Sequence, residues 1–214
     1  MVGSLIEQRS GCDPEAIAAR EADITGKPQR IEPLAEAELS GEAKDLVDRI
    51  RKSAGSDAAS EVPEYFRTMV KHPEIFRCQA EMGTVIFKGR LPPRERELAV
   101  LRVGWLLRAP YEWGEHVVIG KRYGLRPEEI ERVIEGSAAP GWSEHDAAIL
   151  RATEELLSDH AITDETWAVL ARRWDEPQLI EFPMMVGQYV ATGLVQNALR
   201  MRLGPANPGL TLRG

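Results

Sequence analysis

The sequence predicts an all-α protein, built as a compact bundle of helices. Apolar residues recur every three to four positions through most of the chain, whereas the alternation of apolar and polar residues that marks a strand is scarce. Prolines and glycines separate the periodic segments at positions typical of helix starts and ends. The 214 residues, 43% hydrophobic and 29% charged, are enough to enclose a large core in a globular protein.

The chain divides into three parts, of which the first, 1–60, is an N-terminal arm and helix. Glycines and prolines are frequent in residues 1–30, so we expect a loose arm that wraps a partner subunit. An amphipathic helix is expected over 36–53, where the run Lys52-Ser53-Ala54-Gly55-Ser56 stops it.

The second part, 61–139, is the predicted core. Proline suits the first turn of a helix, where its missing N–H costs nothing, and it begins or precedes each helix expected here. The expected helices are 63–70, 73–88, 93–108, one that begins at Pro110, and 128–135, which ends at Gly136.

The third part, 140–214, is a C-terminal helical half and tail. Ser143 can cap a helix that runs to about residue 157, and Thr163 can cap another that runs to residue 173. Residues 176–203 are expected as one long helix or as two helices divided at Pro183. The closing stretch PANPGLTLRG is predicted to be mobile or to contact another subunit.

A lone carboxylate, Glu97, lies inside helix 93–108, in which nearly every face is apolar. Such a helix is buried, and burial raises the pKa of a carboxyl group unless a cation or hydrogen-bond donors hold the charged form. Glu97 is therefore a candidate proton carrier. The alternative is a structural salt bridge with Arg94 or Arg102 at the edge of the helix.

The next helix carries a carboxylate and an imidazole on one face, because Glu112 and His116 are four residues apart. Histidine has an ordinary pKa near neutral pH, which suits general acid–base catalysis. A short turn at 108–110 allows the two helices to pack antiparallel, so that Glu97 faces His116. The alternative is a core histidine that a neighbouring carboxylate satisfies, without chemistry.

These residues resemble the carboxymuconolactone decarboxylase and alkylhydroperoxidase D-like superfamily. The resemblance rests on Glu97, on His116 nineteen positions later in the context YEWxxH, on Gly120 and Gly124, and on the stretch LRPEEIERVIEG, and it covers roughly residues 63–136. It implies a compact helical bundle of the alkylhydroperoxidase D-like type and a homo-oligomer, such as a trimer or a hexamer.

The chain departs from the redox members of that superfamily, which carry two cysteines seven and four residues before the histidine. Ala109 and Glu112 occupy those positions here. A thiol peroxidase needs a thiolate nucleophile, so the peroxiredoxin activity associated with the superfamily is not expected. The two cysteines of the chain are Cys12, in the arm, and Cys78, which we interpret as a small core residue.

The resemblance then implies a cofactor-independent lyase that decarboxylates or isomerises a small lactone or carbonyl acid in aromatic-compound catabolism. His116 would donate the proton, Glu97 would tune or reload it, and Glu112 would orient the ring. The candidates for substrate binding are Tyr111 and Trp113 as a wall against a flat ring, Arg102 and Arg108 as partners of a carboxylate, and Glu115. Both arginines can also be solvated helix charges, and Glu112 would repel an acidic substrate, which favours a neutral one.

Two other functional classes remain open. The first is a peroxide-reducing oxidoreductase that uses Cys78 or Cys12, and the second is a noncatalytic oligomeric protein that binds a ligand. A metal held by the Glu and His side chains is chemically reasonable, but the resemblance implies neither metal nor cofactor. Glu181 and Tyr189 are further candidates for the pocket. The remaining histidines, expected at exposed helix ends, are His72, His145 and His160.

The net charge of −7 disfavours nonspecific binding to nucleic acid or to an acidic membrane. The N-terminus lacks an apolar stretch of signal-peptide length, and no apolar run approaches the roughly 18 residues that span a bilayer. We therefore expect a cytoplasmic protein whose partner is a small-molecule substrate.

Overall fold

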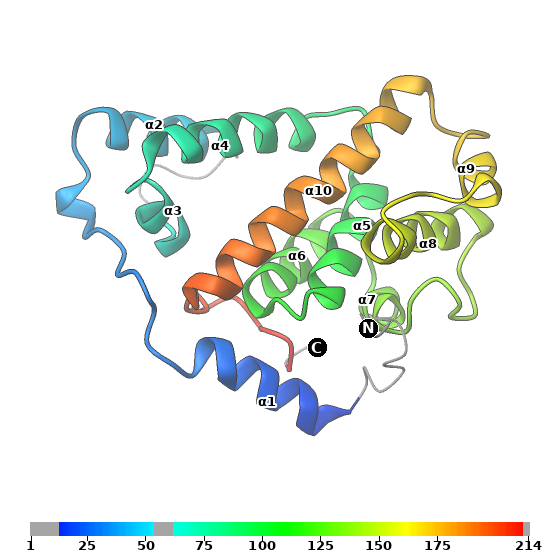
Figure 1. Ribbon diagram of the computed structural model, residues 1–214, viewed down its shortest axis with the longest axis horizontal. Helices are drawn as coiled ribbons and strands as arrows, with labels where there is room; N and C mark the ends of the chain where they lie inside the picture. The colour runs from blue at the N-terminus through cyan, green and yellow to red at the C-terminus, as the bar shows by residue number, and fades with distance from the viewer. Residues whose placement is uncertain (1–12, 54–61, 212–214) are drawn as a thin grey trace.

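The computed structural model describes residues 13–53 and 62–211, and every regular element in these ranges is a helix (Figure 1). The prediction of an all-α fold is confirmed. In chain order the elements are α1 (Pro14–Thr25), the 3-10 helix η1 (Glu36–Glu38), α2 (Gly41–Ser53), α3 (Glu64–Met69), α4 (Pro73–Phe87), α5 (Pro93–Leu106), α6 (Pro110–Arg122), α7 (Pro127–Glu135), α8 (Glu144–Ser158), α9 (Asp164–Leu170) and α10 (Glu176–Leu199).

Helix α5 lies at the centre of the molecule, because its residues are apolar on nearly every side. All its side chains from Glu95 to Trp105 are buried. Helices α6, α7, α8 and α10 pack around it, so that α5 contributes to most of the main core (Figure 1). Burial of each Leu or Val side chain contributes about 1.5–3 kcal/mol, which makes α5 a rigid support for any group it carries.

The turn between α5 and α6 brings α6 back against α5 over a very short connection. Helix α5 ends where Arg108 takes a left-handed conformation with φ 48°, and Pro110 begins α6. Gly104 allows the close approach, since a Cβ there would lie 3.2 Å from the backbone nitrogen of Trp113. The two predicted site helices are therefore fixed against each other by backbone contacts as well as by side chains.

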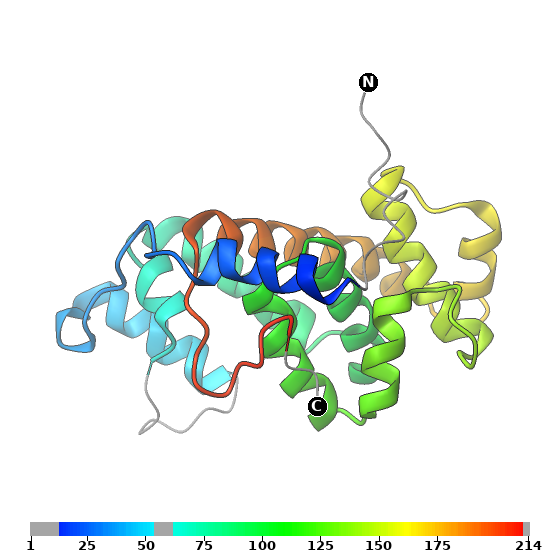
Figure 2. The ribbon, with the colours of Figure 1, turned by 90° about the horizontal axis from the view of Figure 1, so that it is seen from below.

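Helix α10 is continuous, so the alternative of two helices divided at Pro183 is wrong. Asp175 caps its first turn by accepting a hydrogen bond from the Gln178 backbone N–H. The helix ends earlier than predicted, at residue 199, because Arg200 takes the left-handed conformation with φ 56°. It runs along one broad face of the molecule and crosses α5 and α6 (Figures 1 and 2).

Both described ends of the chain pack against the rest of the molecule. Residues 1–12 lie outside the described part, but α1 follows them, and its Ile17 and Ile24 are buried. The Glu21 carboxylate on α1 accepts hydrogen bonds from the backbone of Leu210 and from Thr211. The expected loose arm is thus partly a packed helix, and the predicted mobile tail is held beside it (Figure 2).

Several helix boundaries differ from the predicted ones for local reasons. The expected helix 36–53 is broken, because Leu39 is extended with ψ 112°, and α2 begins only at Gly41. The helix capped by Thr163 ends at residue 170 rather than 173, and a turn then leads to α10. None of the helices in the described ranges has the length and apolar character needed to cross a membrane.

Candidate active site

A buried charged cluster joins α5 to α6. His116 Nδ1 lies 2.6 Å from Glu97 Oε2, and His116 Nε2 lies 3.3 Å from Glu112 Oε1. Glu97 is fully buried, and both Glu112 and His116 are almost so. The imidazole therefore lies between two carboxylates, one from each helix, as the predicted antiparallel packing requires.

The cation that balances Glu97 is Arg96, which the sequence did not single out. Both its Nε and a terminal nitrogen lie 2.9 Å from Glu97 Oε1. The same guanidinium donates to the Phe87 carbonyl at 2.8 Å and stacks over the rings of Phe87 and Tyr123. The alternative of a salt bridge from Glu97 to Arg94 or Arg102 is wrong, although a salt bridge to a neighbouring arginine is present.

The electrostatics of the cluster favour a charged carboxylate beside a charged imidazole. Burial opposes both charges, but His116 and Arg96 outweigh it and lower the pKa of Glu97. Burial likewise opposes the imidazolium, yet Glu97 and Glu112 together raise the pKa of His116 to about 10. At neutral pH His116 therefore carries both protons and can act as a proton donor.

Helix α10, which packs against both α5 and α6, also contacts the cluster. Gln196 Nε2 donates to Glu112 Oε2 at 2.7 Å, and the other amide atom of Gln196, Oε1, is buried without a hydrogen-bond partner. The ring of Tyr189 stands edge-on to His116, with centroids 5.0 Å apart. Burial, with the two nearby carboxylates, raises the pKa of Tyr189, so its hydroxyl stays neutral. The sequence indicated Tyr189 as a pocket candidate and missed Gln196.

The two arginines expected to hold a substrate carboxylate are not at this cluster. Arg102 faces α7 and α8, where it binds Glu154 at 2.8–2.9 Å and donates to the carbonyls of Val133 and Ile134. Arg108 is exposed in the turn between α5 and α6. Arg102 instead holds the C-terminal end of α7, which is a structural task.

The aromatic residues and Glu115 of α6 point in different directions around the helix. Trp113 is fully buried in the core, 5.1 Å from the ring of Trp105, so it forms no wall at His116. Tyr111 packs against Tyr65, with ring centroids 6.1 Å apart. Glu115 accepts from Asn207 of the C-terminal tail at 2.9 Å.

A second buried pair lies on the other side of α5. His145 Nε2 is 3.3 Å from Glu95 Oε2, which also accepts from Trp174 Nε1 at 2.7 Å. The expectation of an exposed helix-end histidine is therefore wrong for His145, because α8 packs its first turn onto α5. His72 and His160 are exposed, as expected.

Cys78 is exposed on α4, so its interpretation as a core residue is wrong. The apolar pattern of α4 suggested that Cys78 is buried, but only part of the apolar surface of this helix packs against α2 and α10.

Glu181 also lies apart from the cluster: its carboxylate accepts from the backbone N–H groups of Arg90 and Leu91, at 2.8 and 3.3 Å. Glu181 therefore fixes the loop that precedes α5 against α10.

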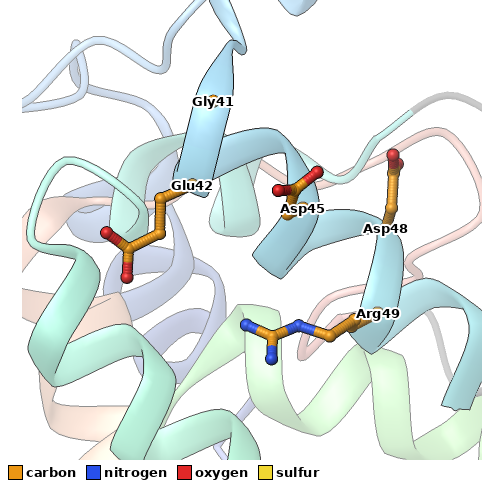
Figure 3. A pocket seen from close by; sticks show the side chains of 5 residues that line it. All are labelled: Gly41, Glu42, Asp45, Asp48 and Arg49. Carbon is orange, nitrogen blue, oxygen red and sulfur yellow. The ribbon is translucent and has the colours of Figure 1, made fainter.

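A hollow on the surface of α2 is lined by exposed residues outside the predicted set (Figure 3). Its lining is Gly41, Glu42, Asp45, Asp48 and Arg49. Within residues 13–53 and 62–211, no group of three or more His, Cys, Asp or Glu side chains is arranged to hold a metal ion. The buried cluster on α5 and α6 is our candidate for chemistry, because it holds an imidazole between two carboxylates.

Comparisons with known proteins agree with this fold. Residues 73–155, which include α5 and α6, match the carboxymuconolactone decarboxylase family. No match was found among curated proteins. The family match covers less than half of the chain, and the segment that matches carries the whole Glu97–His116–Glu112 cluster.

Several solved structures share the fold at low sequence identity. The apo debrominase Bmp8 is 15% identical, with a TM-score of 0.67 over 84% of this chain and 94% of Bmp8. An uncharacterised peroxidase-related protein with an alkylhydroperoxidase AhpD core, from Ralstonia eutropha JMP134, is 16% identical, with a TM-score of 0.71 over 88% of this chain and all of that one. A peroxidase-related protein from Silicibacter sp. TM1040 is 16% identical, with a TM-score of 0.68 over 85% and 96%.

Proposed function

We propose that this protein is a cofactor-independent acid–base lyase that acts on a small lactone or carbonyl compound, with His116 as the proton donor. The observation that carries the proposal is the position of His116 between Glu97 and Glu112, which raises its pKa to about 10. A donor of that strength does not protonate an ordinary carbonyl. It transfers its proton to a strongly basic carbon, such as the carbanion or enolate that forms during the reaction.

In the decarboxylating form, the bond between the carboxylate carbon and the ring breaks, and its electron pair enters the conjugated carbonyl of the lactone. Carbon dioxide leaves, and His116 gives its proton to the carbon that carried the carboxylate. The neutral imidazole then takes a proton from water, which the two carboxylates favour. In the isomerising form, the Glu112 carboxylate takes a proton from one carbon of the substrate and His116 gives its proton to another. The proton on Glu112 then passes to His116, and no carbon dioxide is released.

Nε2 of His116 is the nitrogen better placed to deliver the proton. Its contact with Glu112 is 3.3 Å, whereas Nδ1 is held by Glu97 at 2.6 Å. Glu97, fixed by Arg96, would therefore orient the ring, and Glu112 would lie beside the reacting atoms. Gln196 would hold Glu112 in this position from α10.

The charges around His116 support a neutral substrate more than an acidic one. Arg96 is engaged by Glu97 and by the Phe87 carbonyl, and neither Arg102 nor Arg108 lies at the cluster. The carboxylate of Glu112 adds negative charge next to the transferring nitrogen. These features favour isomerisation of a neutral lactone or carbonyl compound, or a substrate whose own carboxylate leaves early.

A thiol peroxidase is the alternative, and the names of the peroxidase-related structural neighbours favour it. Against it, Ala109 and Glu112 stand where a thiol pair would be, and Cys78 is exposed on α4. One structural neighbour is a cysteine-to-alanine variant of the debrominase Bmp8 in complex with 2,3,4-tribromopyrrole. A small flat ring bound in this fold supports a substrate of similar shape here.

The test is a mass-spectrometric turnover screen of purified, metal-stripped protein against carboxylated lactones, neutral lactones and organic hydroperoxides. The wild type is compared with His116→Asn and with the Cys12→Ser/Cys78→Ser double variant. Turnover of a lactone that needs His116 and neither cysteine supports the proposal. Peroxide consumption that disappears in the cysteine variant establishes the thiol alternative and ends the proposal.

A further inference from the structure

The outer surface of α10 carries an apolar stripe. Its residues recur at alternating intervals of four and three along the helix and are all exposed: Ile180, Met184, Gly187, Ala191, Leu194 and Ala198. The three large members are 67%, 53% and 55% exposed, in chain order. No other described helix lies over this side of α10 (Figures 1 and 2). A stripe of this spacing packs against another helix in a coiled-coil arrangement.

The stripe is complementary to itself when a second copy lies antiparallel on it. About a two-fold axis near residue 189, Ile180 meets Ala198 of the other copy, so a large side chain faces a small one. Gly187 and Ala191 then face each other at the centre, where small side chains allow the two helices to approach closely. Only the pair formed by Met184 and Leu194 brings two large side chains together. Methionine is the most adaptable of the apolar side chains, so it can adjust to this contact.

The two ends of α10 carry opposite charges. The N-terminal end bears exposed Glu176 and exposed Asp175, of which Asp175 lies 3.8 Å from Arg90, and the C-terminal end bears Arg200 and exposed Arg30, which donates to the Ala198 carbonyl. An antiparallel pair sets each acidic end over the basic end of its partner, twice by symmetry. The helix dipoles are also antiparallel in this arrangement, which adds to the attraction.

We infer that the apolar stripe of α10 is the contact between two copies of this chain, packed antiparallel about a two-fold axis. The arrangement also bears on the candidate active site, because α10 carries Gln196 and Tyr189 on its inner side. Pairing would hold this helix against His116 and Glu112. The mass of the protein and the register of the two α10 helices can be measured whether or not the proposed function is correct.

The first experiment measures the mass of the protein by analytical ultracentrifugation over a range of concentrations. The wild type is expected to contain a two-fold contact that Met184→Glu with Leu194→Glu abolishes, which lowers the mass by half or more. Trp167→Glu is the control, because Trp167 on α9 is also a large exposed apolar side chain, at 42%. A monomeric wild type, or an oligomer whose mass survives the double substitution, overturns the inference.

The second experiment tests the register by disulfide cross-linking in the Cys12→Ser/Cys78→Ser background. Gly187→Cys protein mixed with Ala191→Cys protein is expected to form a covalent heterodimer, because these positions face each other. Each variant alone should cross-link poorly, because each position is then displaced along the helices by about 6 Å from its own copy. Equal cross-linking in all three samples, or none in the mixture, contradicts the antiparallel register.

Discussion

Helix α5 supports two buried glutamate–histidine pairs that look alike and differ in their surroundings. Glu97 meets His116 of α6, and Glu95 meets His145 of α8. Each imidazole stands edge-on to an aromatic ring, Tyr189 for His116 at 5.0 Å and a tryptophan of the C-terminal half for His145 at 5.2 Å. The two sites therefore share residue types, burial and geometry.

The difference lies in the number of carboxylates and in their other partners. His116 lies between two carboxylates, and its pKa rises to about 10. His145 has one carboxylate, Glu95, which also accepts from Trp174 and from Arg173 at 3.2 Å. Its Nδ1 is buried without a hydrogen-bond partner. The comparison teaches that the two pairs differ in the negative charge around the imidazole, which is why we propose His116 and not His145 as the proton donor.

The largest expected effect is a difference in activity between variants of His116 and of His145. His116→Asn should lower turnover roughly 10²- to 10⁴-fold, the usual range for loss of a general acid. His145→Asn should leave turnover near the wild-type rate, because that imidazole is held for packing. Steady-state kinetics on any substrate found in the screen checks both. Equal losses in the two variants would remove the functional distinction between the pairs.

The next largest effect is on stability. Glu97→Gln leaves the buried Arg96 guanidinium without its carboxylate and should lower the free energy of unfolding by about 3–5 kcal/mol. Glu95→Gln should cost less, because its cation, Arg173, is 58% exposed at the side chain and water can solvate it. Urea denaturation of both variants beside the wild type measures the difference. A larger loss for Glu95→Gln would contradict this account.

A pH-dependent effect sharpens the role of Glu112. The pKa of His116 is raised in the folded protein, so its contribution to stability is complete below the ordinary value of 6.5 and is lost as the pH rises towards 10. Activity that needs the imidazolium should fall over the same alkaline range. Glu112→Gln removes one of the carboxylates that hold the proton, and should move both transitions to lower pH. Rate and stability profiles that coincide with the wild type would show that Glu112 does not hold the proton.

The smallest effect is expected at Gln196. Gln196→Leu removes the donor to Glu112 Oε2 and should destabilise the protein by about 1–2 kcal/mol while moving the alkaline limb of the rate profile to higher pH. The physical reason is that an unsatisfied buried carboxylate attracts the imidazolium proton more strongly. Thr192→Val, on the same helix, is the control, because Thr192 bonds to Gln79 and Gln188 rather than to Glu112. A shift of equal size in the control would indicate a change in α10 as a whole.

Much of the fold followed from local patterns. Proline at helix starts and caps such as Ser143 and Thr163 marked most helices within one or two residues, because these signals act through the adjacent backbone. The apolar run around Glu97 indicated a buried helix, and it became the centre of the core. The spacing of Glu112 and His116 on one helical face was also a local consequence of helix geometry.

The sequence by itself determined that Glu97 is buried and that Glu112 accompanies His116, whereas the tertiary structure decided what the charged run Arg94–Glu97 contacts. Successive helical residues point about 100° apart, so each member meets a different neighbour. Arg94 binds Asp146 of α8, Glu95 meets His145, Arg96 reaches Phe87, and Glu97 meets His116. No local pattern distinguishes these four, because the choice depends on which helices pack on each side of α5, and that is settled only when the whole core is assembled.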